Sequence, residues 1–132
     1  MILKVFSFFF LFILQSCIDI TDNKNEIIKE RTDHEEIKKC ILFIKSGGTT
    51  VGDSYQISIL SYQDKLNNSD TGNIFIADDP DGGIRSDTSR INFEWISFDT
   101  LKISFDKNIR VFKMNSKAND VTIIYDSLSL TK

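Results

Sequence analysis

The sequence predicts an all-β protein: a single small antiparallel β-sandwich or rolled meander of about seven strands, which follows a signal peptide and a charged tether. Apolar and polar residues alternate with a period of two from residue 40 onward, which places one row of side chains inside and the next outside. The stretches between the alternating segments are rich in Gly, Asp, Asn and Ser, which favour turns. They leave no room for the helices that join parallel strands, so the sequence favours antiparallel pairing.

Seven segments carry the strand pattern. In the clearest one, Ile91, Phe93 and Trp95 alternate with Asn92 and Glu94, so we expect Glu94 to face solvent. The predicted strands are residues 40–45, 55–59, 73–77, 91–95, 101–105, 110–114 and 121–125. The phenylalanines of these segments and turns supply much of the expected core, and they are Phe43, Phe75, Phe93, Phe98, Phe105 and Phe112.

The first 16 residues have the features of a lipoprotein signal peptide. Lys4 is followed by a ten-residue apolar run that ends at Leu14 and is broken only by Ser7. This run is too short for the roughly 20 residues that span a bilayer, but it has the length of a signal-peptide core. Leu14-Gln15-Ser16-Cys17 resembles a lipobox. We expect cleavage before Cys17 and lipidation of its thiol by groups such as palmitate, which would anchor the protein to a membrane of the bacterial cell envelope. The leaflet and the side of the membrane stay open.

Residues 17–38 are expected to be the lipidated cysteine and a charged tether, and residues 39–132 the β domain. The tether is dense in charge and poor in apolar residues, so it is expected to be a mobile spacer that reaches roughly 60–70 Å when extended. A short helix over residues 25–39 is the alternative, because Glu, Lys and Ile are adequate helix formers. Cys40 lies in an apolar stretch. With Cys17 lipidated, Cys40 has no disulfide partner and is expected to be a buried thiol.

The charge balance excludes one class of partner. The chain has 16 basic and 19 acidic residues, and removal of Lys4 with the signal peptide leaves 15 against 19, a net charge of −4. No basic stripe of the kind that binds a phosphate backbone is present in the sequence. Nucleic acid is therefore not an expected partner.

Three segments together resemble a family of small bacterial proteins, many of them lipoproteins. They are the turn at Gly47-Gly48-Thr49-Thr50 with the strand after it, the Asn73-Ile74-Phe75 strand, and the hairpin that contains Trp95. The family pattern is a Gly-Gly-x-Thr-Thr turn, an Asn-Ile-Phe strand and a Trp-containing β-hairpin, and the resemblance covers about residues 40–126. The family has no assigned activity, so the resemblance implies no catalytic residue. The acidic insert at residues 78–83 departs from the family pattern.

Two loops are candidate ligand sites. The turn formed by Gly47, Gly48, Thr49 and Thr50 combines glycine flexibility with hydroxyl groups, which suits either a small anion-binding nest or a plain hairpin turn. Asp78, Asp79 and Asp81 form an acidic loop to which Asp87 could add a fourth carboxylate. Such a loop suits either Ca²⁺, which prefers oxygen ligands, or a solvated turn. The spacing does not match an EF-hand.

The remaining polar residues predict little chemistry. His34 is the only histidine, so a catalytic triad or a zinc site lacks partners, and His34 is expected to be solvated. Arg85 and Arg90 flank a polar stretch that suits either an anion site or a loop with scattered charge.

We therefore expect no catalytic residues and no cofactor other than the alternative Ca²⁺. The expected function is a lipid-anchored, non-enzymatic binding or structural module of the envelope, with the membrane and an envelope protein as partners. The alternative is a small-ligand or calcium-binding lipoprotein that uses the Gly47–Thr50 turn or the Asp78–Asp81 loop.

Overall fold

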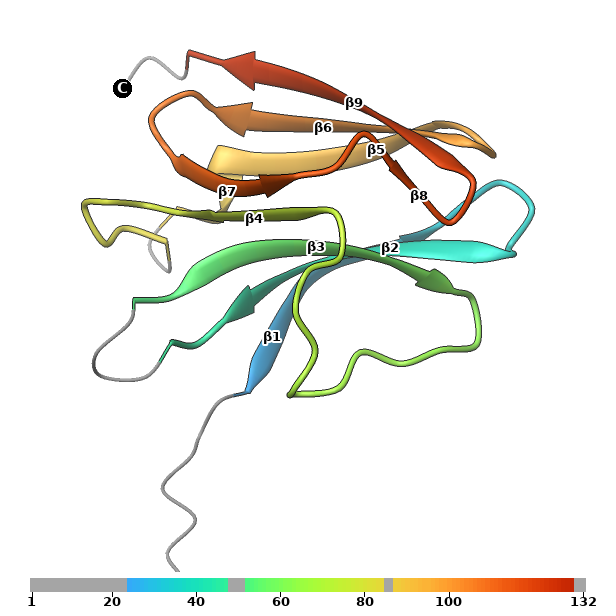
Figure 1. The fold of residues 1–132 in the computed structure, drawn as a ribbon, viewed down its shortest axis with the longest axis horizontal. Helices are drawn as coiled ribbons and strands as arrows, with labels where there is room; N and C mark the ends of the chain where they lie inside the picture. Colours follow the sequence, from blue (N-terminus) through green and yellow to red (C-terminus); the bar gives the residue numbers. More distant parts are fainter. Residues whose placement is uncertain (1–23, 48–51, 85–86, 130–132) are drawn as a thin grey trace, which may run out of the picture.

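The computed structural model describes residues 24–47, 52–84 and 87–129, and this part of the chain is almost entirely β (Figure 1). Its single helical turn is the 3-10 segment η1 (Thr88–Arg90). The strands are β1 (Asn25–Thr32), β2 (Lys38–Lys45), β3 (Ser54–Ser61), β4 (Phe75–Asp78), β5 (Ile91–Ser97), β6 (Thr100–Asp106), β7 (Arg110–Met114), β8 (Lys117–Ala118) and β9 (Val121–Leu128). The predicted all-β class is confirmed. Within the described ranges, no helix is long and apolar enough to cross a bilayer.

The strands form two sheets that pack on each other as a sandwich. One sheet has the order β1-β2-β3-β4-β7 and the other the order β5-β6-β9-β8. Figure 1 shows β5, β6 and β9 in one layer and β2, β3 and β4 in the other. Each of the seven predicted segments forms a strand. Strand pairs are antiparallel except for β6 and β9, which run parallel. The exception arises because residues 107–120 cross to the first sheet through β7 and return through β8.

Two residues with positive φ form the tight turn between β8 and β9. Asn119 and Asp120 link β8 directly to β9, and their φ angles are 49° and 62°. A two-residue hairpin turn with positive φ at both positions matches the natural twist of the strands, and Asn and Asp tolerate this conformation best among residues with a side chain.

The core lies between the two sheets and follows the period-two pattern. The first sheet contributes alternating residues of β2 and β3, and the second contributes alternating residues of β5, β6 and β9. Cys40 is fully buried in this core as a free thiol, and Glu94 is exposed, as predicted. The expected aromatic core is only partly correct. Phe98 and Phe112 are exposed, because one sits in a turn and the other on the edge strand β7.

The predicted tether is wrong for residues 25–32, which form β1 and pair antiparallel with β2. The alternative helix over residues 25–39 is wrong as well, because a turn after β1 leads straight into β2. The charge density that suggested a spacer belongs to an edge strand. Such strands often carry charged side chains, which discourage pairing with other chains. The β domain therefore includes residues 25–32 and does not start at residue 39.

The loop between β3 and β4 covers the outer face of the first sheet. The Gln56 side chain accepts a hydrogen bond from the Gly72 amide at 2.6 Å, and the Ser58 hydroxyl accepts one from the Asn73 amide at 3.1 Å. The Asn73 side chain in turn bonds both the amide and the carbonyl of Ile59. These contacts satisfy polar groups of β3 that are buried on the face opposite the core.

Replacing Gly72 by alanine is expected to destabilise the fold by about 1–3 kcal/mol, the usual range for overpacking. An added Cβ would lie 2.6 Å from the Phe75 carbonyl oxygen and 3.0 Å from Cβ of Gln56, so loop and sheet must separate. Gly52→Ala is the matched control, because a Cβ at that position meets nothing within 4 Å. Urea unfolding of the full chain in mild detergent measures both losses, and equal losses would contradict the close approach.

Candidate functional site

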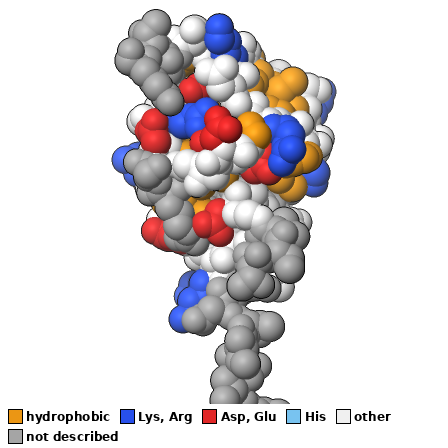
Figure 2. All heavy atoms as spheres, turned by 90° about the vertical axis from the view of Figure 1, so that its left-hand side faces the viewer, with side chains coloured by type: hydrophobic (Ala, Val, Ile, Leu, Met, Phe, Trp, Pro, Cys, Tyr) orange, Lys and Arg blue, Asp and Glu red, His pale blue; other side chains and the backbone are white. Residues whose placement is uncertain are grey.

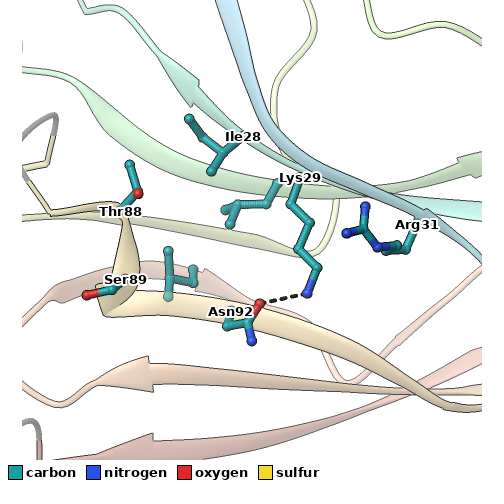
Figure 3. A pocket seen from close by; sticks show the side chains of 8 residues that line it. Ile28, Lys29, Arg31, Thr88, Ser89 and Asn92 are labelled. Atoms are coloured by element: carbon teal, nitrogen blue, oxygen red, sulfur yellow. Dashed lines mark hydrogen bonds between the residues drawn. The ribbon is translucent and has the colours of Figure 1, made fainter.

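A solvent-open hollow of about 400 Å³ lies where edge strand β1 of one sheet faces edge strand β5 of the other. Its floor is apolar and consists of Ile28, Leu42 and Ile91. Its rim is polar and carries Lys29, Arg31, Thr88, Ser89 and Asn92 (Figure 3). Among the described residues, no carboxylate lines it. The hollow therefore combines two positive charges with an apolar base.

A β-bulge in β1 produces this mixture of side chains. Ile27 pairs with Phe43 and Lys29 pairs with Leu42, so Ile28 is an extra residue without a partner on β2. A bulge of this kind re-aims neighbouring side chains. Here Ile28 packs against the core while Lys29 extends across the opening toward Asn92 (Figure 3).

Lys29 joins the two sheets by contacts with neutral groups. Its Nζ donates hydrogen bonds to Asn92 Oδ1 at 2.8 Å and to the Phe93 carbonyl at 2.7 Å, and it lies 4.7 Å from the centre of the Phe93 ring. Burial, followed by the positive charge of Arg31, lowers the pKa of Lys29 from its ordinary value, and Glu94 acts weakly in the opposite direction. Lys29 is thus a partly desolvated cation held in one position.

Arg31 supplies the second charge. Its guanidinium donates to the Glu30 carbonyl at 2.7 Å, while its own carbonyl accepts the indole N–H of Trp95 at 3.0 Å. Among the described residues, neither Arg31 nor Lys29 forms an ion pair with a carboxylate. The hollow therefore carries two positive charges that form no ion pair with a described carboxylate.

The acidic loop after β4 has a different arrangement, in which arginines hold the carboxylates. Asp79 accepts hydrogen bonds from the amides of Asp81 at 2.9 Å and Gly83 at 3.1 Å, and it forms a short ion pair with Arg90. Asp78 binds Arg110 through two hydrogen bonds of 3.0 and 2.7 Å. On this side of the molecule, acidic and basic side chains lie next to one another (Figure 2).

The carboxylates predicted to share a calcium ion are thus directed to different protein partners. Asp81 is exposed, and Asp87 accepts hydrogen bonds from the amide and hydroxyl of Ser89. In the described ranges, no three acidic, His or Cys side chains are grouped as metal ligands. The calcium site stays a prediction, and these contacts do not favour it.

Arg90 lies between two carboxylates and is not available to a ligand. It pairs with Asp79 on the loop after β4 and with Asp106 at the end of β6, the latter at 3.2 Å. The pKa of Asp79 is lowered first by the amide of Asp81, and the pKa of Asp106 first by the amide of Asn108, with Arg90 adding to both. The anion site predicted around Arg85 and Arg90 is therefore not supported at Arg90, and Arg85 lies outside the described residues.

A buried tyrosine completes this polar cluster. The Tyr55 hydroxyl lies 3.2 Å from the Ile84 carbonyl and 2.5 Å from the Asp87 carbonyl. Burial raises the pKa of Tyr55 to about 12, so the hydroxyl stays protonated and can donate. It ties the β4–β5 connection to β3, which is a structural role.

The other predicted site residues are only partly described. Gly47 is half-buried two residues after the end of β2, whereas Gly48, Thr49 and Thr50 lie outside the described residues, as does Cys17. His34 is exposed in the turn after β1, as predicted.

Sequence reasoning missed Lys29 and Arg31, because both fall in the stretch predicted to be a tether. One signal could have indicated them. Side chains two residues apart lie on the same face of a strand, so the pair would share a face once residues 25–32 are taken as β. Their approach to β5 could not be found this way, because Asn92 is far away in the sequence.

Comparisons with protein-family models, with curated proteins and with solved structures find no match to this chain.

Proposed function

We propose that this chain is a lipid-anchored protein of the bacterial cell envelope, and that its β-sandwich is a non-enzymatic binding module. The lipobox-like segment Leu14–Cys17 supports the anchor. The hollow between β1 and β5 supports the binding role and carries this part of the proposal. It is preformed by strands, and it has a few directed polar groups above an apolar floor, as ligand sites commonly do.

The arrangement of charge separates the hollow from the rest of the polar surface. Arg90 and Arg110 each have carboxylate partners that satisfy them within the fold. Lys29 and Arg31 are held close enough for their charges to interact, although like charges near each other destabilise a fold. A bound anionic or polar ligand would offset this repulsion, which is why we place the binding role at the hollow.

Substitution Cys17→Ala is expected to abolish incorporation of labelled palmitate, because the thiol of Cys17 is the proposed acceptor. Cys40→Ala is the matched control and should leave the label unchanged, since Cys40 is fully buried in the core. The measurement is autoradiography of the full chain expressed in labelled bacteria. Label retained in Cys17→Ala would refute the anchor.

A further inference from the structure

We propose that the hollow between β1 and β5 binds a small organic anion, whose carboxylate or phosphate group pairs with Lys29 and Arg31 and whose apolar part rests on Ile28, Leu42 and Ile91. This inference rests on the proposed binding function and names the chemical class of its ligand.

The unused donors of the two cations are the first support. An ammonium group has three N–H donors, and Lys29 uses two of them on Asn92 Oδ1 and the Phe93 carbonyl. Arg31 donates to the Glu30 carbonyl and has further donors in a planar fork, which suits carboxylate and phosphate oxygens. Figure 3 shows both side chains at the same side of the hollow. An anion there would receive hydrogen bonds from both.

The rigidity of Lys29 is the second support. Two hydrogen bonds and the contact with the Phe93 ring hold its Nζ in place before any ligand arrives. A preorganised group loses little conformational entropy on binding, so more of the interaction energy contributes to affinity. The charge of Glu94 raises the pKa of Lys29, but burial and the charge of Arg31 lower it by more.

The apolar floor and the size of the hollow define the rest of the ligand. A volume of about 400 Å³ falls in the range of small-molecule sites. Ile28 is half-buried, with Leu42 and Ile91, each only 2% exposed, beneath it. These side chains offer no hydrogen bonds, so the base favours a hydrocarbon or aromatic portion. Thr88 and Asn92 on the rim can bond a polar substituent. A free inorganic anion would use only the cationic half of the site.

The test is calorimetric titration of the full chain in non-ionic detergent with benzoate, phenyl phosphate, benzamide and inorganic phosphate. Benzoate or phenyl phosphate should bind, and whichever binds tighter identifies the anionic group. Neutral benzamide should not bind, and inorganic phosphate should bind more weakly than phenyl phosphate. Lys29→Met and Arg31→Gln should each weaken binding at least about tenfold, the usual effect of losing a charged hydrogen bond.

Lys117→Met is the matched control, because Lys117 is exposed on β8 at the opposite edge of the second sheet. It should leave the affinity unchanged. Arg31 is exposed, so Arg31→Gln keeps the test decisive if Lys29→Met fails to fold. Absence of binding by both aromatic anions at millimolar concentration, or equal affinity in wild type and Arg31→Gln, would overturn the proposal. Equal affinity for inorganic phosphate and phenyl phosphate would overturn the role of the floor.

The titration and the palmitate experiment test different parts of the proposal, so either one can fail without the other. Loss of label in Cys17→Ala, together with no anion binding in wild type, would remove the ligand class and leave the anchored module. Anion binding, together with label retained in Cys17→Ala, would keep the ligand site and remove the anchor.

Discussion

Replacing Arg90 by methionine is expected to destabilise the full chain by about 3 kcal/mol or more, the range found when one partner of a buried ion pair is removed. The Arg90 side chain is only 15% exposed and lies between the carboxylates of Asp79 and Asp106. Methionine keeps most of the aliphatic volume but leaves both carboxylates without their cation. Urea unfolding at neutral pH, followed by circular dichroism, measures the loss.

Arg110→Met is the matched control for this substitution. Arg110 also pairs with an aspartate, Asp78, but its side chain is 58% exposed. Exposed ion pairs contribute little because water screens the charges, so Arg110→Met should destabilise the chain much less than Arg90→Met. Equal losses for the two variants would show that the ion pairs of Arg90 are no more important than a surface contact.

The pH dependence of the folding stability gives a second test of the ion pairs that Arg90 forms with Asp79 and Asp106. The pKa values of Asp79 and Asp106 are lowered in the fold, so their contribution to stability is present above the ordinary carboxyl pKa of about 4. It is lost as the pH falls through the lowered values, because the carboxylates become protonated. The difference in stability between wild type and Arg90→Met should therefore shrink at acid pH. If the stability difference between wild type and Arg90→Met stays constant while the carboxylates become protonated, an electrostatic cause is contradicted.

Phe75→Ala is expected to destabilise the chain by about 3–5 kcal/mol, the usual loss for a phenylalanine in a core. Phe75 is fully buried on β4, and its ring centre lies 5.4 Å from that of Phe105 and 6.0 Å from that of Tyr125. Phe75 belongs to the first sheet, and the other two rings belong to the second. The cavity would therefore open between the two sheets. Domains of this size are commonly stable by only about 5–15 kcal/mol. The unfolding midpoint in urea should fall accordingly.

Phe112→Ala is the control, because it removes an exposed phenylalanine instead of a buried one. Phe112 is 61% exposed on β7, and the Arg110 guanidinium lies 5.1 Å from its ring centre. We expect a loss of at most about 1 kcal/mol, as for exposed cation–π contacts. If Phe75→Ala does not fold, Phe75→Leu should fold with a smaller loss. A loss at Phe112 as large as that at Phe75 would contradict the placement of the core.

Periodicity predicted most strands but not their arrangement. Segments such as Leu101–Phe105 alternate strictly, because one face of each strand meets the core and the other meets water. The parallel pairing of β6 with β9 could not be predicted in this way, since alternation says nothing of strand order or direction. The parallel pair forms because the chain crosses from β6 in the second sheet to β7 in the first before it returns to β9. The two-residue strand β8 is too short to show a period.

The strand β1 was missed for a different reason. Glu26, Lys29, Glu30 and Arg31 give it the composition of a solvated segment. Composition and periodicity conflict at an edge strand, where only one side has a partner and charges are tolerated.

The surroundings of the candidate site residues depend on partners that are distant in the sequence. The acidic loop suggested a metal because the sequence shows the carboxylates together, whereas the arginines that hold them are at positions 90 and 110. The hollow was not predicted for the same reason. Lys29 reaches Asn92 and the Phe93 carbonyl across the gap between two sheets. Local sequence shows which charges exist, and the topology decides which of them meet.

The start of β1 limits how far the proposed anchor would let the domain travel. Asn25 follows Cys17 by eight residues, and a chain of that length spans at most about 30 Å. The predicted tether of about twenty residues would reach about twice as far, so the volume open to the tethered domain is roughly eightfold smaller than expected. A lipidated domain would thus be confined to a thin layer beside the bilayer. Within this layer its effective concentration toward membrane-associated ligands would be high, and more distant ones would have to diffuse to it.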